Sequence, residues 1–136
     1  MMLYIRADMN ETIATGHMMR CLSIADAARE LGEETTFLLA DMQAVELLES
    51  KGYKYIVLNT EWNNMESELE ILKEIISEHE IKTLFIDSYQ VTERYLEELT
   101  KLTRTIYLDD VNAFHYPVTG IICYANYYEK FQYKEN

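Results

Sequence analysis

The segment that decides the fold runs from Arg6 to Cys21 and reads Arg-Ala-Asp-Met-Asn-Glu-Thr-Ile-Ala-Thr-Gly-His-Met-Met-Arg-Cys. The apolar residues at positions 2–5 before it are typical of a buried strand. After it, small and apolar residues recur at helical spacing, namely Cys21, Leu22, Ala25, Ala28 and Leu31. The segment is therefore a strand-to-helix loop. In open α/β folds such loops lie at the carboxyl edge of a parallel sheet, where ligands bind.

The loop carries side chains that can do chemistry. Gly16 is expected to let the backbone turn, which puts His17 at or next to the helix N-terminus. The positive end of the helix dipole disfavours imidazolium there, so a neutral imidazole that can accept a proton as a general base is expected. Arg20, three residues after His17, projects from nearly the same helix face as His17. Arg6 and Asp8 close the other side of the loop. On these residues alone, a capping or partly buried histidine without chemistry is an equal alternative.

Composition limits the classes of function. A chain of 136 residues with 49% hydrophobic residues has room for one domain with a proper core. A formal net charge of −12 argues against nucleic acid or anionic membranes as partners, so an anionic ligand would depend on the local basic island of the loop.

The sequence predicts a cytoplasmic protein without a metal site. It contains no apolar run that could span a membrane and no N-terminal signal-peptide pattern. Cys21 and Cys123 each lie in apolar segments and are interpreted as reduced core residues. No spacing of cysteine, histidine and carboxylates suggests metal ligands, and no glycine-rich phosphate loop or nucleophile elbow is present.

Strands and helices are predicted to alternate along the chain. Further strands are expected at 35–40, 53–58, 82–86, 104–108 and 118–123, and the first helix from His17 or Met18 to Leu31. Helix signals include Gly32 and Gly52 as stops, Asp41 and Thr92 as caps, and a capping box of Asn63 with Glu66. The apolar face of the helix capped by Thr92 is expected to carry Tyr95, Leu96, Leu99 and Leu102. This order predicts an α/β, Rossmann-like parallel sheet with helices on both faces over residues 1–126, followed by a tail or linker at 127–136.

Polar clusters fall where the predicted strands end. Besides the first loop, these clusters are Asp87-Ser88-Tyr89, Asp109-Asp110 and Asn126. The carboxyl ends of parallel strands share one edge, which favours a site there. The hydroxyls of Ser88 and Tyr89 suit sugar hydroxyl and acetamido groups, whereas Asp87 and Asp109 are common turn-capping residues.

Two aromatic side chains outside these clusters are given structural interpretations. Trp62 is interpreted mainly as an anchor of its own loop, with a sugar-stacking platform as the alternative. His79 lies near a predicted helix end and is interpreted as structural rather than as a ligand.

Several of these motifs resemble one known family. Arg-Ala-Asp at 6–8, Thr-Gly-His-Met-Met-Arg-Cys-Leu at 15–22, Ile-Asp-Ser-Tyr at 86–89 and Leu-Asp-Asp at 108–110 occur in order. They resemble the UDP-2,4-diacetamido-2,4,6-trideoxy-β-L-altropyranose hydrolases of pseudaminic acid biosynthesis and the related spore-coat polysaccharide proteins. That family is similar in fold to the MurG-type, GT-B glycosyltransferases.

The resemblance implies the N-terminal half of a GT-B enzyme that acts on a UDP-sugar without a metal or other cofactor. A C-terminal domain, which this sequence does not contain, would grip most of the UDP. His17 would be the general base that activates water. The substrate-binding residues implied or expected are Arg6, Asp8, Gly16, Arg20, Ser88, Tyr89, Asp110 and Asn126.

Two other functions remain open on the sequence. One is a glycosyltransferase, in which His17 would activate a sugar hydroxyl instead of water. The other is a non-catalytic binding module within a fused sugar-biosynthesis protein. A receiver-like form of that module is disfavoured, because the aspartate pair follows the fifth predicted strand rather than the first.

Overall fold

The computed structural model describes residues 2–11, 15–109 and 117–123. In this part of the chain one parallel sheet has the strand order β3-β2-β1-β4-β5-β6. The strands are β1 (Met2–Ala7), β2 (Glu34–Leu39), β3 (Lys54–Val57), β4 (Thr83–Asp87), β5 (Arg104–Asp109) and β6 (Gly120–Cys123). The predicted Rossmann-like α/β fold is confirmed, with strand bounds that differ by one or two residues from those expected.

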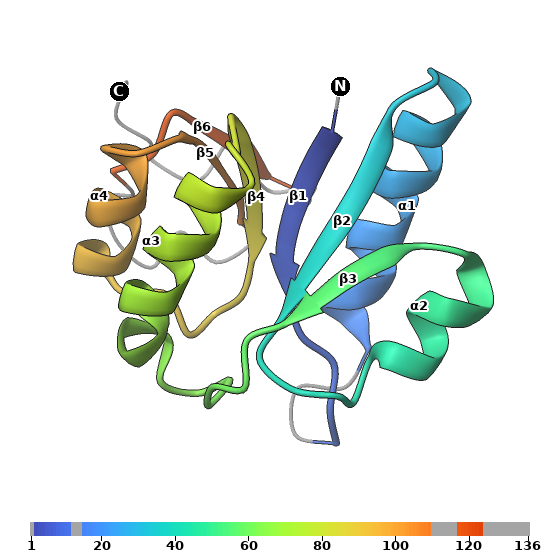
Figure 1. Ribbon diagram of the computed structural model, residues 1–136, viewed down its shortest axis with the longest axis horizontal. Coiled ribbons are helices and arrows are strands. Elements are labelled where there is room, and N and C mark those ends of the chain that lie inside the picture. The colour runs from blue at the N-terminus through green and yellow to red at the C-terminus, as the bar shows by residue number, and fades with distance from the viewer. Residues whose placement is uncertain (1, 12–14, 110–116, 124–136) are drawn as a thin grey trace.

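The helices lie on both faces of this sheet. They are α1 (Gly16–Glu30), α2 (Val45–Lys51), α3 (Leu69–Glu78), which follows the short 3₁₀ helix η1 (Met65–Glu68), and α4 (Glu93–Thr100). Figure 1 shows α1 and α2 on one side of the sheet, and α3 and α4 on the other. After β1 the chain adds β2 and then β3 on one side of it. The chain then returns to form β4 on the other side of β1, and adds β5 and β6 beyond it. The boundary between β1 and β4 is therefore the topological switch point of the sheet.

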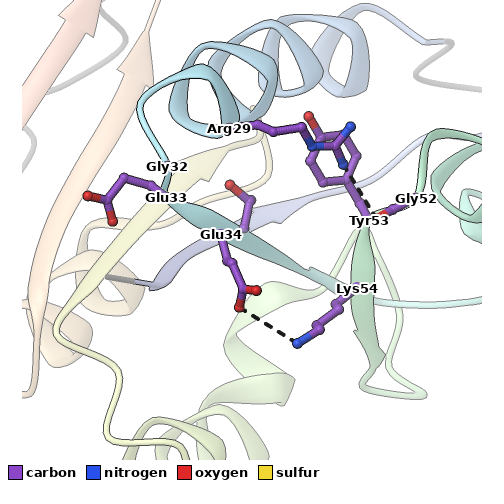
Figure 2. Close-up of a pocket in the computed structure, with 8 residues that line it drawn as sticks. Arg29, Gly32, Glu33, Glu34, Gly52, Tyr53 and Lys54 are labelled. Carbon is purple, nitrogen blue, oxygen red and sulfur yellow. Dashed lines mark hydrogen bonds and ion pairs between the residues drawn. The ribbon is translucent and has the colours of Figure 1, made fainter.

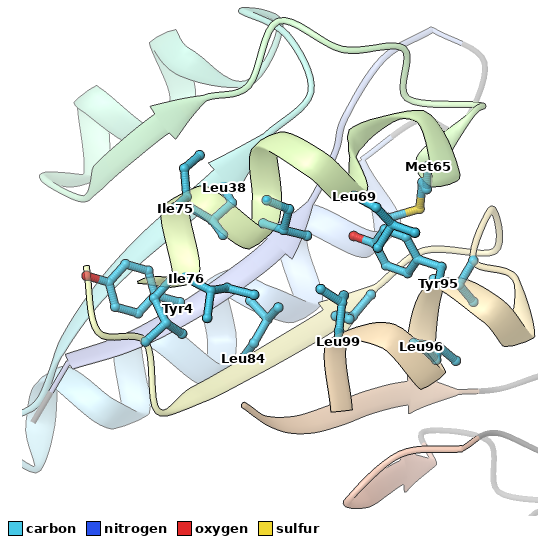
Figure 3. Packing of buried hydrophobic residues seen from close by; sticks show 14 of the residues in the cluster. Tyr4, Leu38, Met65, Leu69, Ile75, Ile76, Leu84, Tyr95, Leu96 and Leu99 are labelled. Carbon is cyan, nitrogen blue, oxygen red and sulfur yellow. The ribbon is translucent and has the colours of Figure 1, made fainter. Parts of the chain in front are cut away.

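Both faces of the sheet are apolar because helices cover both. Successive side chains of β1 point to opposite faces, so Tyr4 packs with α3 and α4 while Ile5 packs with α1 and α2. Figure 3 shows the first of these clusters, in which apolar residues of α3 and α4 meet the sheet. Its labelled members are Tyr4, Leu38, Met65, Leu69, Ile75, Ile76, Leu84, Tyr95, Leu96 and Leu99.

Several helix ends lie where glycine and threonine in the sequence predict them. Gly52 ends α2 in the left-handed conformation (φ 76°), and Gly32 follows α1 with φ 82°. The side chain of Thr92 accepts a hydrogen bond from the backbone N–H of Tyr95 and so caps α4 as predicted.

Three local predictions were wrong. Asp41 does not cap α2: its carboxylate accepts from the N–H of Gln43, two residues on, and the helix begins at Val45. Asn63 and Glu66 form no capping box, because the chain enters η1 at Met65 and Glu66 instead accepts from the Thr92 hydroxyl (2.5 Å). Leu102, expected on the apolar face of α4, lies beyond the helix end with its surface 49% exposed.

Candidate functional site

The candidate site lies at the switch point between β1 and β4. His17 stands in the first turn of α1, which follows β1, and Asp87 is the last residue of β4. Nδ1 of His17 lies 2.5 Å from Oδ1 of Asp87, and the side chains are 7% and 0% exposed. The two residues reach each other because β1 and β4 are neighbours in the sheet, with Ala7 paired to Asp87.

Arg20 joins this pair from the next turn of α1. Its Nε donates to Oδ2 of Asp87 (3.1 Å) and its Nη2 to Oδ1 (2.9 Å), so the guanidinium spans both carboxylate oxygens. Nη2 also lies 2.7 Å from Nδ1 of His17. The prediction that Arg20 shares a face with His17 holds, and both side chains contact Asp87.

These contacts favour a proton on Nδ1 of His17, because its contact with the carboxylate is the shorter of the two. A carboxylate oxygen only accepts hydrogen bonds, so its 2.5 Å contact requires a proton on Nδ1 of His17. A guanidinium only donates, so Nη2 of Arg20 cannot bond to a protonated Nδ1, and its hydrogen goes to Asp87. Nε2 of His17 is then the ring nitrogen that can accept a proton.

Tyr89 and Ser88 follow Asp87 but face different ways. The Tyr89 ring meets the His17 ring edge-on, with centroids 4.6 Å apart and planes at 75°, and its side chain is 48% exposed. Ser88 is buried; its hydroxyl accepts from the N–H of Gln90 and its carbonyl accepts from the Tyr107 hydroxyl. Tyr89 is therefore beside His17 as predicted, whereas the Ser88 side chain belongs to the turn rather than to a ligand surface.

The buried Cys21 thiol adds a weak hydrogen bond to the same carboxylate, with Sγ 3.7 Å from Oδ2 of Asp87. Burial, together with the negative charge of Asp87, raises the pKa of the Cys21 thiol well above its ordinary value. A protonated thiol is a poor nucleophile, so Cys21 serves here as a donor to Asp87.

Arg6 is not available to a ligand in this structure. Its guanidinium is fully buried and donates twice to Glu68 at 2.8 Å and once to Asp8 at 2.8 Å. Burial alone lowers the pKa of Arg6, but the negative charges of Glu68 and Asp8 outweigh it and hold the pKa above its ordinary value. The expectation that Arg6 offers a cation to the substrate is thus replaced by a supporting role. Sequence reasoning missed Glu68, which comes from η1.

Asp8 has a structural role of the same kind. Its Oδ2 accepts from Arg6, and its Oδ1 accepts from the N–H of Ala40 (2.9 Å), which follows β2. Asp8 thereby ties the carboxyl ends of β1 and β2 together. Both of its oxygens are engaged in bonds within the protein.

The sequence also predicts Gly16, Asp110 and Asn126 as substrate-binding residues, and structural roles for Trp62 and His79. Gly16 is the first residue of α1, its φ is not positive, and a Cβ there would meet nothing within 4 Å, so the structure does not require glycine for a turn at this point. Asp110 and Asn126 lie outside the described residues. Trp62 is half-buried, and His79 is the exposed C-cap of α3.

A separate pocket opens at the opposite, amino edge of β2 and β3, with a volume of about 310 Å³. In Figure 2, dashed lines join Arg29 to Gly52 and Lys54 to Glu34. Arg29 lies 4.0 Å over the Tyr53 ring and donates to the carbonyls of Lys51 and Gly52, while Lys54 pairs with Glu34 at 3.7 Å.

Residues 2–11, 15–109 and 117–123 contain no helix long and apolar enough to cross a bilayer. Nor do three or more histidine, cysteine or carboxylate side chains within them converge as a metal site.

Fold and site together define a Rossmann-like α/β protein with a buried histidine–aspartate–arginine cluster at its switch point. Comparison with known proteins identifies no matching family model, no curated relative and no matching solved structure. The chemistry of the cluster is thus the main guide to function.

Proposed function

We propose that this chain is the catalytic-base domain of a nucleotide-sugar hydrolase that releases UDP from a UDP-sugar. The observation that carries the proposal is the 2.5 Å contact between Nδ1 of His17 and Oδ1 of Asp87 at the switch point. It leaves Nε2 of His17 as a proton acceptor at the edge of the sheet where open α/β folds bind ligands. The substrate class comes from the resemblance of residues 6–22 to the UDP-sugar hydrolases of pseudaminic acid biosynthesis.

In the proposed reaction His17 acts as a general base. Nε2 takes a proton from water as the water oxygen attacks the anomeric carbon from the face opposite the nucleotide. The bond between that carbon and the diphosphate oxygen breaks, its electron pair leaves with UDP, and the anomeric configuration inverts. Asp87 remains a carboxylate throughout and stabilises the imidazolium that forms.

A general base supplies only part of the rate enhancement of such a reaction. A positioned general base typically contributes on the order of 10²- to 10⁴-fold, and the remainder would come from orientation and from charge stabilisation at the diphosphate. UDP is a good leaving group, so no strong general acid is required. The exposed ring of Tyr89 beside His17 is the proposed contact for the sugar.

The proposal includes a partner domain and a cellular role. A second GT-B domain would hold most of the UDP across the cleft. The reaction would belong to cytoplasmic synthesis of nonulosonic acid or another cell-surface polysaccharide.

The test is release of UDP from a panel of UDP-sugars, measured on this chain and on the complete encoded protein. The His17→Ala and His17→Asn variants are expected to lose at least about 100-fold in kcat while UDP binds nearly unchanged. His79→Ala, which removes an exposed histidine at the end of α3, is the matched control and should retain activity. Near-normal turnover by His17→Asn would exclude His17 as the base.

A glycosyltransferase is the second candidate, because the same accepting Nε2 could take the proton of a sugar hydroxyl. The product separates the two: a hydrolase yields the free sugar and a transferase yields a new glycoside. A folded protein inactive on every UDP-sugar and with every acceptor would instead favour the non-catalytic module.

A further inference from the structure

We infer that Arg20 is a positioning residue that acts on His17 through Asp87, rather than a ligand for the substrate's diphosphate; the inference rests on the proposed function. Nε and Nη2 of Arg20 are both directed at the two oxygens of Asp87, at 3.1 and 2.9 Å. The Asp87 carboxylate is completely buried, whereas the Arg20 side chain is 24% exposed.

His17 and Arg20 stand three residues apart on α1, so one helix turn presents both to the same carboxylate. Asp87 is fixed at the end of β4, and its Oδ2 also accepts from the buried Cys21 thiol. Arg20 holds both carboxylate oxygens, which sets the plane of the carboxylate and therefore the direction from which Oδ1 meets Nδ1 of His17.

The charge of Arg20 also affects the protonation of the ring. A buried carboxylate whose only partner is an imidazole favours the doubly protonated, positively charged ring, because the interior screens the anion poorly. A ring that already holds two protons cannot accept another. Arg20 supplies the positive charge that Asp87 requires, so the ring can keep one proton on Nδ1 and leave Nε2 free to accept.

The contacts of Arg20 with Asp87 disfavour a role as a direct ligand of the diphosphate. A diphosphate that engaged Nε and Nη2 would have to take them from Asp87 and leave a buried anion with less compensation, which is costly. Lysine would keep the charge but offers one nitrogen, which cannot span two oxygens as a guanidinium does. The inference therefore predicts that Arg20→Lys is impaired in orientation and Arg20→Gln in both orientation and charge.

The direct test is ¹H–¹⁵N NMR of the imidazole nitrogens in the 136-residue chain, which needs no substrate and no activity. In the unmodified protein His17 should show a protonated Nδ1 and an unprotonated Nε2 at neutral pH. In Arg20→Gln the doubly protonated ring should increase, and in Asp87→Asn the proton should move largely to Nε2. An unmodified protein with its proton on Nε2, or an Arg20→Gln variant with an unchanged ring, would overturn the inference.

Kinetics on the complete encoded protein give the second readout. A positioning role predicts that Arg20→Gln lowers kcat by about 10-fold or more while UDP affinity stays within about 2-fold. Arg104→Gln, which removes an exposed arginine at the amino edge of β5, is the charge-matched control and should behave as the unmodified protein. A large loss of UDP affinity with unchanged kcat would make Arg20 a substrate ligand instead. If no variant hydrolyses any UDP-sugar, the proposed function fails while the NMR result still decides the role of Arg20.

Discussion

Nδ1 of His17 lies 2.5 Å from Oδ1 of Asp87, although 70 positions separate the two residues in the chain. The contact is a product of topology. His17 follows β1, which is extended by β2 and β3 on one side. Asp87 ends β4, which is extended by β5 and β6 on the other. A doubly wound sheet brings these two strand ends together, and here they place a histidine against a buried carboxylate.

The Asp87→Asn variant tests the orientation of the base. An amide in place of the carboxylate can donate to Nδ1, which moves the ring proton to Nε2 and removes the accepting lone pair there. We expect kcat for UDP-sugar hydrolysis to fall by at least about 100-fold, the scale on which a misplaced base acts. Steady-state kinetics would check this, with circular dichroism to show that the variant is folded.

Asp41→Asn is the matched control for that variant. Asp41 lies in the β2–α2 connection, where its carboxylate accepts from the Gln43 N–H, a bond that an asparagine side chain can also accept. The Asp41→Asn variant should therefore hydrolyse UDP-sugars with the kcat of the unmodified protein. Equal activity of the Asp87→Asn and Asp41→Asn variants would contradict the role of Asp87.

The Glu68→Gln variant tests the buried ion pair beneath the site. Glu68 and Arg6 are both completely buried and share two hydrogen bonds of 2.8 Å, with the Tyr95 hydroxyl as a third partner at 3.0 Å. Glutamine would leave the Arg6 charge with Asp8 as its main counter-ion. We expect the free energy of unfolding to fall by about 3–5 kcal/mol, measured by urea denaturation.

Two further variants separate charge from packing at this pair. Glu70→Gln, two residues away and exposed, should change stability by less than about 0.5 kcal/mol. The triple variant Arg6→Met/Asp8→Asn/Glu68→Leu should regain much of the loss, because it leaves no buried charge without a counter-ion, and the asparagine at position 8 can still accept from the N–H of Ala40. A Glu68→Gln protein as stable as Glu70→Gln would show that the pair contributes little.

The sequence predicted the fold better than the site, for physical reasons. Alternating strand and helix patterns, the glycine stops and the Thr92 cap are local signals, so β–α alternation could be read without knowing which strands are neighbours. The pairing of His17 with Asp87 depends on β1 lying next to β4, which no local pattern encodes. The sequence therefore places Asp87 in a polar cluster at a strand end, with turn capping as the alternative, and does not predict its contact with His17.

The role of Arg6 was misjudged for a related reason. An arginine at the end of a strand looks like a cation offered to a ligand. Its partner Glu68 lies 62 positions away, in a segment rich in acidic residues that resembles an ordinary solvated helix face. Only the fold shows that Glu68 is turned inward and completely buried.

Alkaline pH should destabilise the protein through Tyr53. Burial, with the hydrogen bond to Asp26, raises the pKa of Tyr53 to about 12. The folded state therefore holds this proton more tightly than the unfolded state, in which the pKa is about 10. The stabilisation is complete below about pH 10 and is lost as the pH rises through about 12.

Urea denaturation of the unmodified protein and of Tyr53→Phe between about pH 9 and pH 12 would measure this contribution. Phenylalanine keeps the ring under Arg29 but has no proton to lose. The difference in stability between the two proteins should be constant below about pH 10 and shift in favour of Tyr53→Phe above it. A difference that does not change with pH would show that Tyr53 has an ordinary pKa in the folded protein.

Leu99 and Leu102 form a matched pair for testing the core under α4. Leu99 is completely buried in the cluster between α3, α4 and the sheet, whereas Leu102 is 49% exposed just beyond the end of α4. We expect Leu99→Ala to lower the free energy of unfolding by about 2–5 kcal/mol, through lost burial and the cavity left behind, and Leu102→Ala to lower it by less than about 1 kcal/mol. Urea denaturation with an unchanged m-value would measure both. Similar losses for the two variants would mean that α4 does not pack on the sheet through Leu99, and would put in doubt the placement of the β4–α4 connection that carries Tyr89.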